Sequence, residues 1–524
     1  METFETRWIQ ARRLEADGRN AEACAAYEEI LKIEPSRLYA RLRLSDLLVS
    51  ADRYREARLH VVRSIEDVED GKRAADLHQV TRRLLFFGEY EHVSRLIMQA
   101  HWNQPETIAS SPFLIQHLWL SGEVRSALVL CERMLAIAPE HAALNYCYGL
   151  LLNYAGNTEP AARAFDRCIK AQPDHAAAHW SLAYLLKSDM PLARVSRVEW
   201  ALAANADAPD AQTFLHYALY REHENAGEND KAWRHLELGA KLKRNLLSYD
   251  GDAEDQAVQA LLDYPPAKGR AITHKLRHLF IVGMPRTGTT LLERILGAHP
   301  DTVADGELTE FRDSINWCLD KFVGPKLDYE DVVRMRQVDL HELGDIYGKS
   351  VQWRMPDHES ILINKHPENF MLSRFIAEAL PDAKIICLRR NPMDACFSNL
   401  KELFVDESYG YSYTLSELAD HYHRFHCLSH HWQKTMPDSF HLIDYEYLVT
   451  DPVASVSAIF EFCGLDFDVT YLDITRNSTP VATASAAQVR KPISAGAVGA
   501  WKRYESHLAP LKSRLESLGH AIDQ

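Results

Sequence analysis

A short glycine loop carries the residues with the clearest chemistry. Gly283 and Gly288 have the spacing of G-x-x-x-x-G-K-[ST], and Thr290 meets its last position. In such a loop, backbone N–H groups converge on a phosphate at the start of a helix. The lysine that neutralises the outer phosphates of a nucleoside triphosphate is absent, because Thr289 occupies its position and Arg286 lies inside the loop. The loop therefore predicts an anionic ligand whose end is less charged than a γ-phosphate.

A phosphosulfate meets this requirement. Its terminal sulfuryl group carries one negative charge and needs no metal, so the lysine and the magnesium of a triphosphatase become unnecessary. The competing interpretation is a phosphotransferase with a degenerate loop, which predicts magnesium-dependent binding of ATP. The missing lysine counts against that alternative.

The loop lies between an expected strand and an expected helix. Residues 279–282 are all apolar, as in a buried parallel strand, and residues 290–296 carry apolar side chains at helical spacing. Strands alternating with helices predict an α/β, doubly wound, P-loop-like parallel sheet with helices on both faces. The further strands are expected at 361–363, 383–388 and 440–443, and the further helices at 370–380 and 453–462.

Four sequence blocks, in order, resemble the sulfotransferases. Residues 285–290 look like the 5′-phosphosulfate loop of that family, and residues 390–398 look like its 3′-phosphate element. Residues 490–492 and 499–502 resemble the C-terminal element that closes on the same nucleotide. Over roughly residues 276 to 510, the chain is most similar to the tyrosylprotein sulfotransferase-like group. Bacterial members of that group join tetratricopeptide repeats to a sulfotransferase domain.

The resemblance implies a sulfotransferase that uses 3′-phosphoadenosine 5′-phosphosulfate (PAPS) as donor and no metal. The loop residues that would hold the 5′-phosphosulfate are Arg286, Thr287, Gly288, Thr289 and Thr290. The other donor ligands that the resemblance implies are Arg390, Ser398, Tyr445, Arg490 and Lys491. For Tyr445 the alternative is a core aromatic side chain at a strand end.

Catalysis by such an enzyme is an in-line displacement at sulfur, in which positioning and charge stabilisation do most of the work. Lys365 ends an expected buried strand, and it matches the family lysine that stabilises charge on the oxygen leaving sulfur. Arg286 would add charge near the same oxygen. Ser485 matches a serine near the reacting centre.

The resemblance places the general base, which takes the proton of the acceptor hydroxyl, at Glu307, with Glu310 as the backup. His366 is a rival, because related families with hydroxysteroid or phenol acceptors use a histidine. As the strand neighbour of Lys365, however, it points to the opposite side. In the animal tyrosylprotein enzymes an arginine that helps to hold acidic peptides stands where this chain has Thr309. The acceptor is therefore left open among protein tyrosine, a saccharide hydroxyl and a small phenol.

The first half of the chain repeats with a period of 34 residues. At this step a turn residue, a small helix residue and a helix-ending proline recur: Gly122, Ala127 and Pro139, then Gly156, Ala161 and Pro173. Further copies pass through the turn residues Gly18, Asp52, Gly88 and Gly227. The pattern resembles the tetratricopeptide repeat, whose helix pairs stack into an all-α superhelix.

The expected organisation is a tetratricopeptide domain over residues 1–245, a connector over 246–275 and a sulfotransferase domain over 276–524. The groove of the superhelix would hold an acceptor protein or peptide. The alternative is a packing and dimerisation element, which allows a homodimer. Another alternative is a repeat scaffold with an inactive sulfotransferase-like domain, but the donor residues of the motifs are present.

Composition sets broader limits. With 524 residues, the chain is long enough for two or more domains, and its net charge of −15 argues against a general nucleic-acid binder. Nine scattered cysteines form no C-x-x-C pair, which disfavours zinc and a disulfide framework and suits a reducing compartment. No membrane segment or signal peptide is evident, so a cytoplasmic location is expected.

Five histidines lie close together on one expected helix in the second half of the chain. We expect this cluster to form a helix surface rather than a metal site, because no carboxylate or cysteine completes a ligand set apart from Cys427, which points elsewhere. Its members are His421, His423, His426, His430 and His431.

Overall fold

The computed structural model describes residues 4–69, 71, 73–187, 191–265, 278–355, 360–404, 407–477 and 489–522. The chain folds into two compact units. The first comprises residues 1–138, 309–324 and 334–353, and the second comprises residues 139–308, 325–333 and 354–524. These units do not coincide with the boundaries expected near residues 245 and 276, which stay a prediction.

The first unit is helical. Its helices from the N-terminal part of the chain are α1 (Phe4–Ala16), α2 (Asn20–Ile33), α3 (Leu38–Ser50), α4 (Tyr54–Arg63), α5 (Leu77–Phe86), α6 (Tyr90–Met98), α7 (Pro105–Ala109), α8 (Ser111–Leu120) and α9 (Val124–Ile137). Two helices from the second half of the sequence join them: α18 (Glu310–Leu319) and α20 (Leu340–Val351). The start of α4 holds the end of α18, since the Arg55 side chain donates hydrogen bonds to the carbonyls of Trp317 and Cys318 at 2.7 and 3.0 Å.

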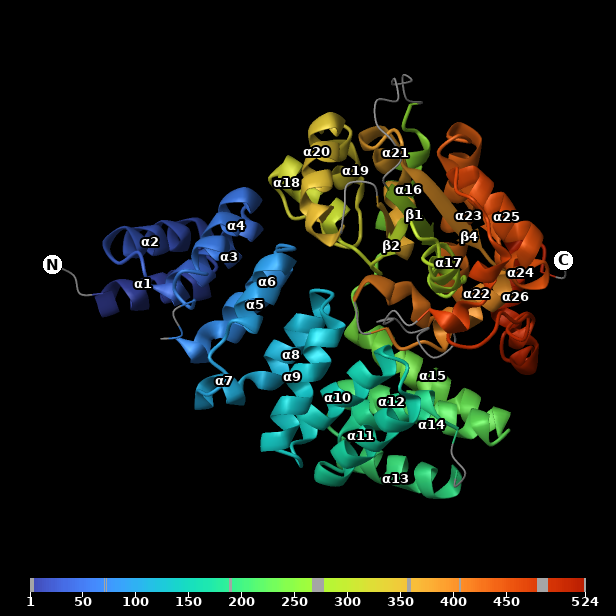
Figure 1. Cartoon of the computed structure of the whole chain (residues 1–524), viewed down its shortest axis with the longest axis horizontal. Coiled ribbons are helices and arrows are strands. Elements are labelled where there is room, and N and C mark those ends of the chain that lie inside the picture. Colours follow the sequence, from blue (N-terminus) through green and yellow to red (C-terminus); the bar gives the residue numbers. More distant parts are fainter. Residues whose placement is uncertain are drawn as a thin grey trace. The chain divides into compact units, whose positions relative to one another are not determined.

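Helices of the second unit begin with α10 (Ala142–Tyr154), α11 (Thr158–Ala171), α12 (Ala176–Leu185), α13 (Pro191–Ala204), α14 (Pro209–Asn225), α15 (Asn229–Leu246) and α16 (Gly251–Leu262) (Figure 1). Tight turns join the helices of each pair in both units. Six turn residues have left-handed φ values between 53° and 95°, namely Gly18, Asp52, Gly88, Gly122, Gly156 and Gly227. Glycine adopts this conformation without steric cost, so the predicted turn positions are confirmed. Membership of the tetratricopeptide family stays a prediction.

A five-stranded parallel sheet forms the centre of the second unit. Its strands are β1 (His278–Gly283), β2 (Thr302–Ala304), β3 (Ile361–Lys365), β4 (Lys384–Arg389) and β5 (Phe440–Asp444). The spatial order is β2-β3-β1-β4-β5, and all four pairings are parallel. The expected strands and the parallel sheet are therefore confirmed.

Helices pack on the sheet because its strands are apolar on both faces. Leu279 and Ile281 of β1 belong to a core cluster with residues of α17 (Thr289–Leu296) and α25 (Pro452–Cys463). The strand period of two turns Phe280 and Val282, which are also fully buried, to the opposite face. The remaining helices are α19 (Tyr329–Met335), α21 (Ser373–Ala379), α22 (Pro392–Leu400), α23 (Leu415–Thr435), α24 (Tyr445–Thr450) and α26 (Ala509–Ser517). Short 3₁₀ turns are η1 (Ala74–Asp76), η2 (Gln352–Arg354), η3 (Pro367–Leu372), η4 (Glu407–Tyr413), η5 (Val469–Leu472), η6 (Ile474–Arg476) and η7 (Ala500–Tyr504).

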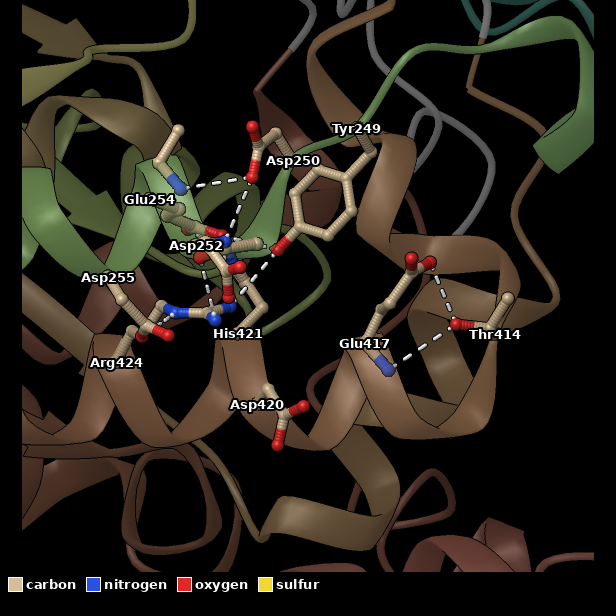
Figure 2. A network of polar contacts seen from close by, with 12 residues as sticks. Tyr249, Asp250, Asp252, Glu254, Asp255, Thr414, Glu417, Asp420, His421 and Arg424 are labelled. Carbon is tan, nitrogen blue, oxygen red and sulfur yellow. Dashed lines mark hydrogen bonds and ion pairs between the residues drawn. The ribbon is translucent and has the colours of Figure 1, made fainter.

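The expected connector contains a helix, α16, that a polar network ties to α23. Figure 2 shows Glu254 between His421 and Arg424. The Glu254 carboxylate lies 2.6 Å from Nδ1 of His421 and 3.2 Å from the Arg424 guanidinium, which also contacts Asp255 at 2.6 Å. Burial would raise the pKa of Glu254, but the charges of His421 and Arg424 outweigh it and lower that pKa to about 2.

This network corrects the prediction of a helix surface for one member of the histidine cluster, His421. His421 is buried, with 5% of its surface exposed, and its ring stacks on Tyr411 at 3.5 Å between centroids. Burial of this polar ring is tolerated because Glu254 supplies a hydrogen-bond partner. His430, in contrast, is exposed.

The network predicts that Glu254→Gln destabilises the protein by about 1–3 kcal/mol at neutral pH, since charge-assisted hydrogen bonds are lost. A lowered carboxyl pKa stabilises the folded state above the unfolded pKa, so the difference from wild type should shrink as the pH falls from about 4.5 toward 2. Urea unfolding across this range measures it. Asp420→Asn is the matched control on α23: Asp420 has no dashed contact in Figure 2 and pairs at 2.8 Å with the exposed Arg514, so its loss should cost only about 0.2–1 kcal/mol.

Candidate functional site

The candidate residues of the second unit follow the carboxyl ends of all five strands. Ends of parallel strands lie at one edge of a sheet, which brings together segments that are distant in sequence. β1 leads to β2 on one side, whereas β4 leads to β5 on the other. The chain therefore leaves the neighbours β1 and β4 in opposite directions, and ligands of open α/β sheets bind at such a point.

The glycine loop joins β1 directly to α17. Gly288 is the N-cap of α17 and has a φ of 103°. Arg286 also has a left-handed φ, 67°, which is uncommon for a residue with a side chain and marks local strain. Two hydrogen bonds fix the loop from inside: the Thr287 hydroxyl donates to the Met284 carbonyl at 2.7 Å, and the Asn399 amide donates to the Pro285 carbonyl at 2.8 Å.

Arg390 connects the end of β4 to this loop. Its guanidinium donates a hydrogen bond to the Arg286 carbonyl at 3.1 Å and lies 4.7 Å above the centre of the Tyr445 ring. The same ring occupies the space beside Gly288, since a Cβ atom there would lie 2.5 Å from the ring. Burial raises the pKa of Tyr445, although the Arg390 charge opposes this. The structure thus brings the predicted residues Arg286, Gly288, Arg390 and Tyr445 together.

Helix α22 carries Ser398 and starts beside Arg390. Ser398 is buried, and so is Asp394 one turn before it. The Asp394 carboxylate accepts the backbone N–H groups of Gly499 at 2.6 Å and Trp501 at 3.3 Å, and it lies 4.0 Å from Arg390. The C-terminal segment predicted to close on the nucleotide is therefore bound to α22 by a carboxylate.

Lys365, at the end of β3, has a carboxylate on each of two neighbouring segments close to its ammonium group. Its side chain is fully buried, and its Nζ lies 2.5 Å from Glu307 Oε1 and 4.0 Å from Glu293 Oε2. Glu293 of α17 also accepts the backbone N–H of Gly306 at 2.9 Å, and burial raises its pKa. The 305–307 segment is held from its other side by a hydrogen bond from the Lys365 N–H to the Gly306 carbonyl at 3.0 Å. Lys365 and Glu307 are thus juxtaposed.

Several predicted residues lie elsewhere. The Arg490 guanidinium donates to the Tyr154 carbonyl at 2.6 Å and packs against the turn residue Gly156. Among the described residues no hydrogen bond joins Arg490 to the glycine loop or to Arg390. Lys491 is exposed, and Ser485 lies outside the described residues.

The two carboxylates considered as a base fall into different units. Glu307 belongs to the second unit, whereas Glu310 begins α18 in the first. His366 follows β3 with extended backbone, at φ −124° and ψ 109°. These angles do not decide between His366 and Glu307, so His366 stays the alternative general base.

Three buried carboxylates of the site were not predicted from the sequence. Glu293, Asp394 and Glu402 each lie within 4.0 Å of a predicted cation, namely Lys365, Arg390 and Arg286. A signal was present for Glu293, which interrupts an otherwise apolar helix face after the loop. The sequence contains no such signal for Asp394 and Glu402, because the tertiary fold determines which cations they contact.

Comparison with known protein families finds a match in this half of the chain. Residues 278–469 match the model of the Sulfotransferase family. The matched residues include the glycine loop, Glu307, Lys365, Arg390, Ser398 and Tyr445. The family match therefore covers the five strands and the edge at which these residues gather.

A relative from Aquifex aeolicus (strain VF5), whose name assigns it no function, is 30% identical over 307 residues. The match covers 56% of this chain and 40% of the relative, so the chain spans less than half of that protein.

Solved sulfotransferase structures show a weaker likeness. The sulfotransferase domain of the Synechococcus PCC 7002 olefin synthase is 20% identical with a TM-score of 0.34, over 49% of this chain and 100% of that one. Mouse sulfotransferase SULT7A1 complexed with PAP is 16% identical with a TM-score of 0.29, over 52% and 92%. Scores of this size do not establish a common fold.

Two general features of the described part of the chain bear on function. No group of three or more His, Cys, Asp or Glu side chains there has an arrangement suited to a metal ion. None of its helices combines the length and apolar character needed to cross a membrane.

The contact between Gly288 and Tyr445 predicts the effect of a methyl group in the loop. Gly288→Ala should lower the free energy of unfolding by about 1–3 kcal/mol more than Gly306→Ala, because only the first substitution overpacks the ring. Gly306 is the matched control: its φ of 79° is also left-handed, but no atom lies within 4 Å of the position that an alanine methyl group would take. Urea unfolding of both variants measures the difference, and equal losses would contradict the described packing.

Proposed function

We propose that the protein is a sulfotransferase that moves the sulfuryl group of PAPS to an acceptor hydroxyl. The observation that carries this proposal is the hydrogen bond from Arg390 to the carbonyl of Arg286, in a region that matches the sulfotransferase family. It joins the loop expected to hold the 5′ end of the donor to the arginine expected to hold its 3′-phosphate. The loop also lacks the lysine that a γ-phosphate requires.

In this proposal the donor lies along the carboxyl edge of the sheet. The N–H groups at the start of α17, with Arg286 and the hydroxyls of the loop threonines, bind the 5′-phosphosulfate. Arg390 and Ser398 bind the 3′-phosphate from the start and middle of α22. Tyr445 packs between the loop and Arg390 and fixes their separation.

Sulfuryl transfer forms a bond from the acceptor oxygen to sulfur and breaks the bond from sulfur to the 5′-phosphate oxygen. Glu307 takes the acceptor proton, and Lys365 stabilises the negative charge on the leaving phosphate oxygen. The 2.5 Å contact between these two side chains supports the assignment, because an in-line displacement places the acceptor and leaving oxygens on opposite sides of one sulfur atom, within reach of two neighbouring groups. The products are a sulfate ester and 3′-phosphoadenosine 5′-phosphate (PAP).

The acceptor in this proposal is a protein or peptide presented by the helix pairs of the first half, which we assign to the tetratricopeptide family. Support comes from left-handed turn residues that recur at 34-residue steps at Gly88, Gly122 and Gly156. Stacked helix pairs of this kind expose an extended surface suited to a peptide.

The donor assignment predicts that PAP stabilises the protein against heat and that ATP with magnesium does not. A ligand at 100 times its Kd adds about 2.7 kcal/mol to the stability of the folded state. Arg390→Ala should abolish this gain, whereas Arg389→Ala should retain it, since Arg389 forms its own pair with Asp444 at 2.6 and 2.9 Å. Stabilisation by ATP alone would instead support the phosphotransferase.

The base assignment predicts that Glu307→Gln binds PAP like wild type but transfers sulfuryl groups about 10²–10⁴-fold more slowly. Transfer from radiolabelled PAPS to a panel of a tyrosine peptide, a phenol and a saccharide measures the rate. The matched controls are Glu310→Gln and His366→Asn, which should keep most of the activity. An active Glu307→Gln beside an inactive His366→Asn would reassign the base to the histidine.

A further inference from the structure

Lys401 follows the last residue of α22 and lies three positions after Ser398. Its side chain is partly buried, and its Nζ lies 5.0 Å from the centre of the Phe397 ring. Within the described part of the chain, no carboxylate lies within 4.0 Å of this ammonium group. Loss of hydration lowers the pKa of Lys401 to about 8.

The surroundings of Lys401 carry an excess of positive charge. Arg286, Arg390 and Arg221 all act on its ammonium as repelling charges, whereas Glu224 and Glu402 attract it. Glu224 is already shared, since it pairs with Arg221 and lies 3.6 Å from Arg503.

The other two carboxylates nearby are engaged as well. Glu402 lies 3.8 Å from Arg286, and Asp394 lies 4.0 Å from Arg390 while accepting two backbone N–H groups. Lys401 is therefore left without a close counter-ion beside the two arginines assigned to the donor.

Two tyrosines fix the backbone that carries this lysine. The Tyr184 hydroxyl of α12 donates to the Lys401 carbonyl at 2.7 Å, and the Tyr217 hydroxyl of α14 donates to the Leu400 carbonyl at 2.9 Å. Both bonds satisfy carbonyls that the end of α22 leaves open. The main chain at Lys401 is held in place, so only its flexible side chain can adjust to a ligand.

We propose that Lys401 is a further ligand of the donor and supplies a third positive charge to its phosphate groups, beside Arg286 and Arg390. The inference rests on the proposed function. A partly desolvated cation without a counter-ion is costly in the free protein, and an arriving anion removes that cost. Tyr184 of α12 and Tyr217 of α14 then act as positioning residues for this lysine.

A purely structural role is the competing account. A lysine at the end of a helix interacts favourably with the helix dipole, and its removal then lowers stability. The two roles predict opposite effects on the free protein. A ligand role predicts that Lys401→Met leaves the thermal midpoint of the free protein unchanged or raises it, and that the affinity for PAP falls.

The test is calorimetric titration with PAP, together with thermal unfolding without ligand, for wild type, Lys401→Met, Lys401→Arg and Lys434→Met. We expect Lys401→Met to weaken PAP binding about 10- to 100-fold, the effect of one charge-assisted hydrogen bond. Lys401→Arg should keep most of the affinity because it keeps the charge. Lys434, an exposed lysine of α23, is the matched control and should bind PAP like wild type.

Wild-type affinity in Lys401→Met would overturn the inference and leave the proposed function intact. A lower thermal midpoint with unchanged affinity would assign Lys401 to the helix end. A wild-type protein that does not bind PAP would refute the proposed function itself, so the two failures are distinguished by the wild-type titration.

Discussion

Three cations of the site each have a buried carboxylate just outside hydrogen-bonding distance. Lys365 lies 4.0 Å from Glu293, Arg390 lies 4.0 Å from Asp394 and Arg286 lies 3.8 Å from Glu402. Removing one member of a buried pair leaves an uncompensated charge, so these carboxylates allow cations to gather at one sheet edge. At about 4 Å, each carboxylate attracts its cation electrostatically but leaves the best hydrogen-bonding positions of that cation unoccupied.

The carboxylates also connect the site to the rest of the second unit. Glu293 accepts the N–H of Gly306 and thereby fixes the segment that carries Glu307. Asp394 binds the N–H groups of Gly499 and Trp501, so the C-terminal segment stays against α22. One set of buried charges thus holds both the proposed base and the segment expected to cover the nucleotide.

Local features of the sequence predicted the sheet and its loop well. Short apolar runs predicted the strands, and the glycine spacing predicted the turn between β1 and α17. Few other arrangements satisfy both the apolar run and the glycine spacing. Left-handed turn positions were equally visible, since Gly156 and its counterparts repeat. Helix α16 was missed, because Asp-Gly and Tyr-Pro-Pro at its two ends resemble a connector.

Long-range partners could not be predicted in the same way. Nothing near Glu254 in the sequence indicates that it pairs with His421, and nothing near α18 indicates that this helix packs with α4. The position of Arg490 beside Gly156 is a similar case. These contacts depend on how complete helices pack, and residue spacing along the chain carries little information about that.

The two tyrosine hydroxyls at the end of α22 have a consequence for synthesis of the chain. Tyr184 and Tyr217 leave the ribosome long before Leu400 and Lys401, whose carbonyls they bind in the finished protein. Neither hydroxyl can form these bonds until α22 has been synthesised, although domains tend to fold as units from the N-terminal side. A nascent chain that stops before α22 therefore leaves both tyrosine hydroxyls without these two acceptors.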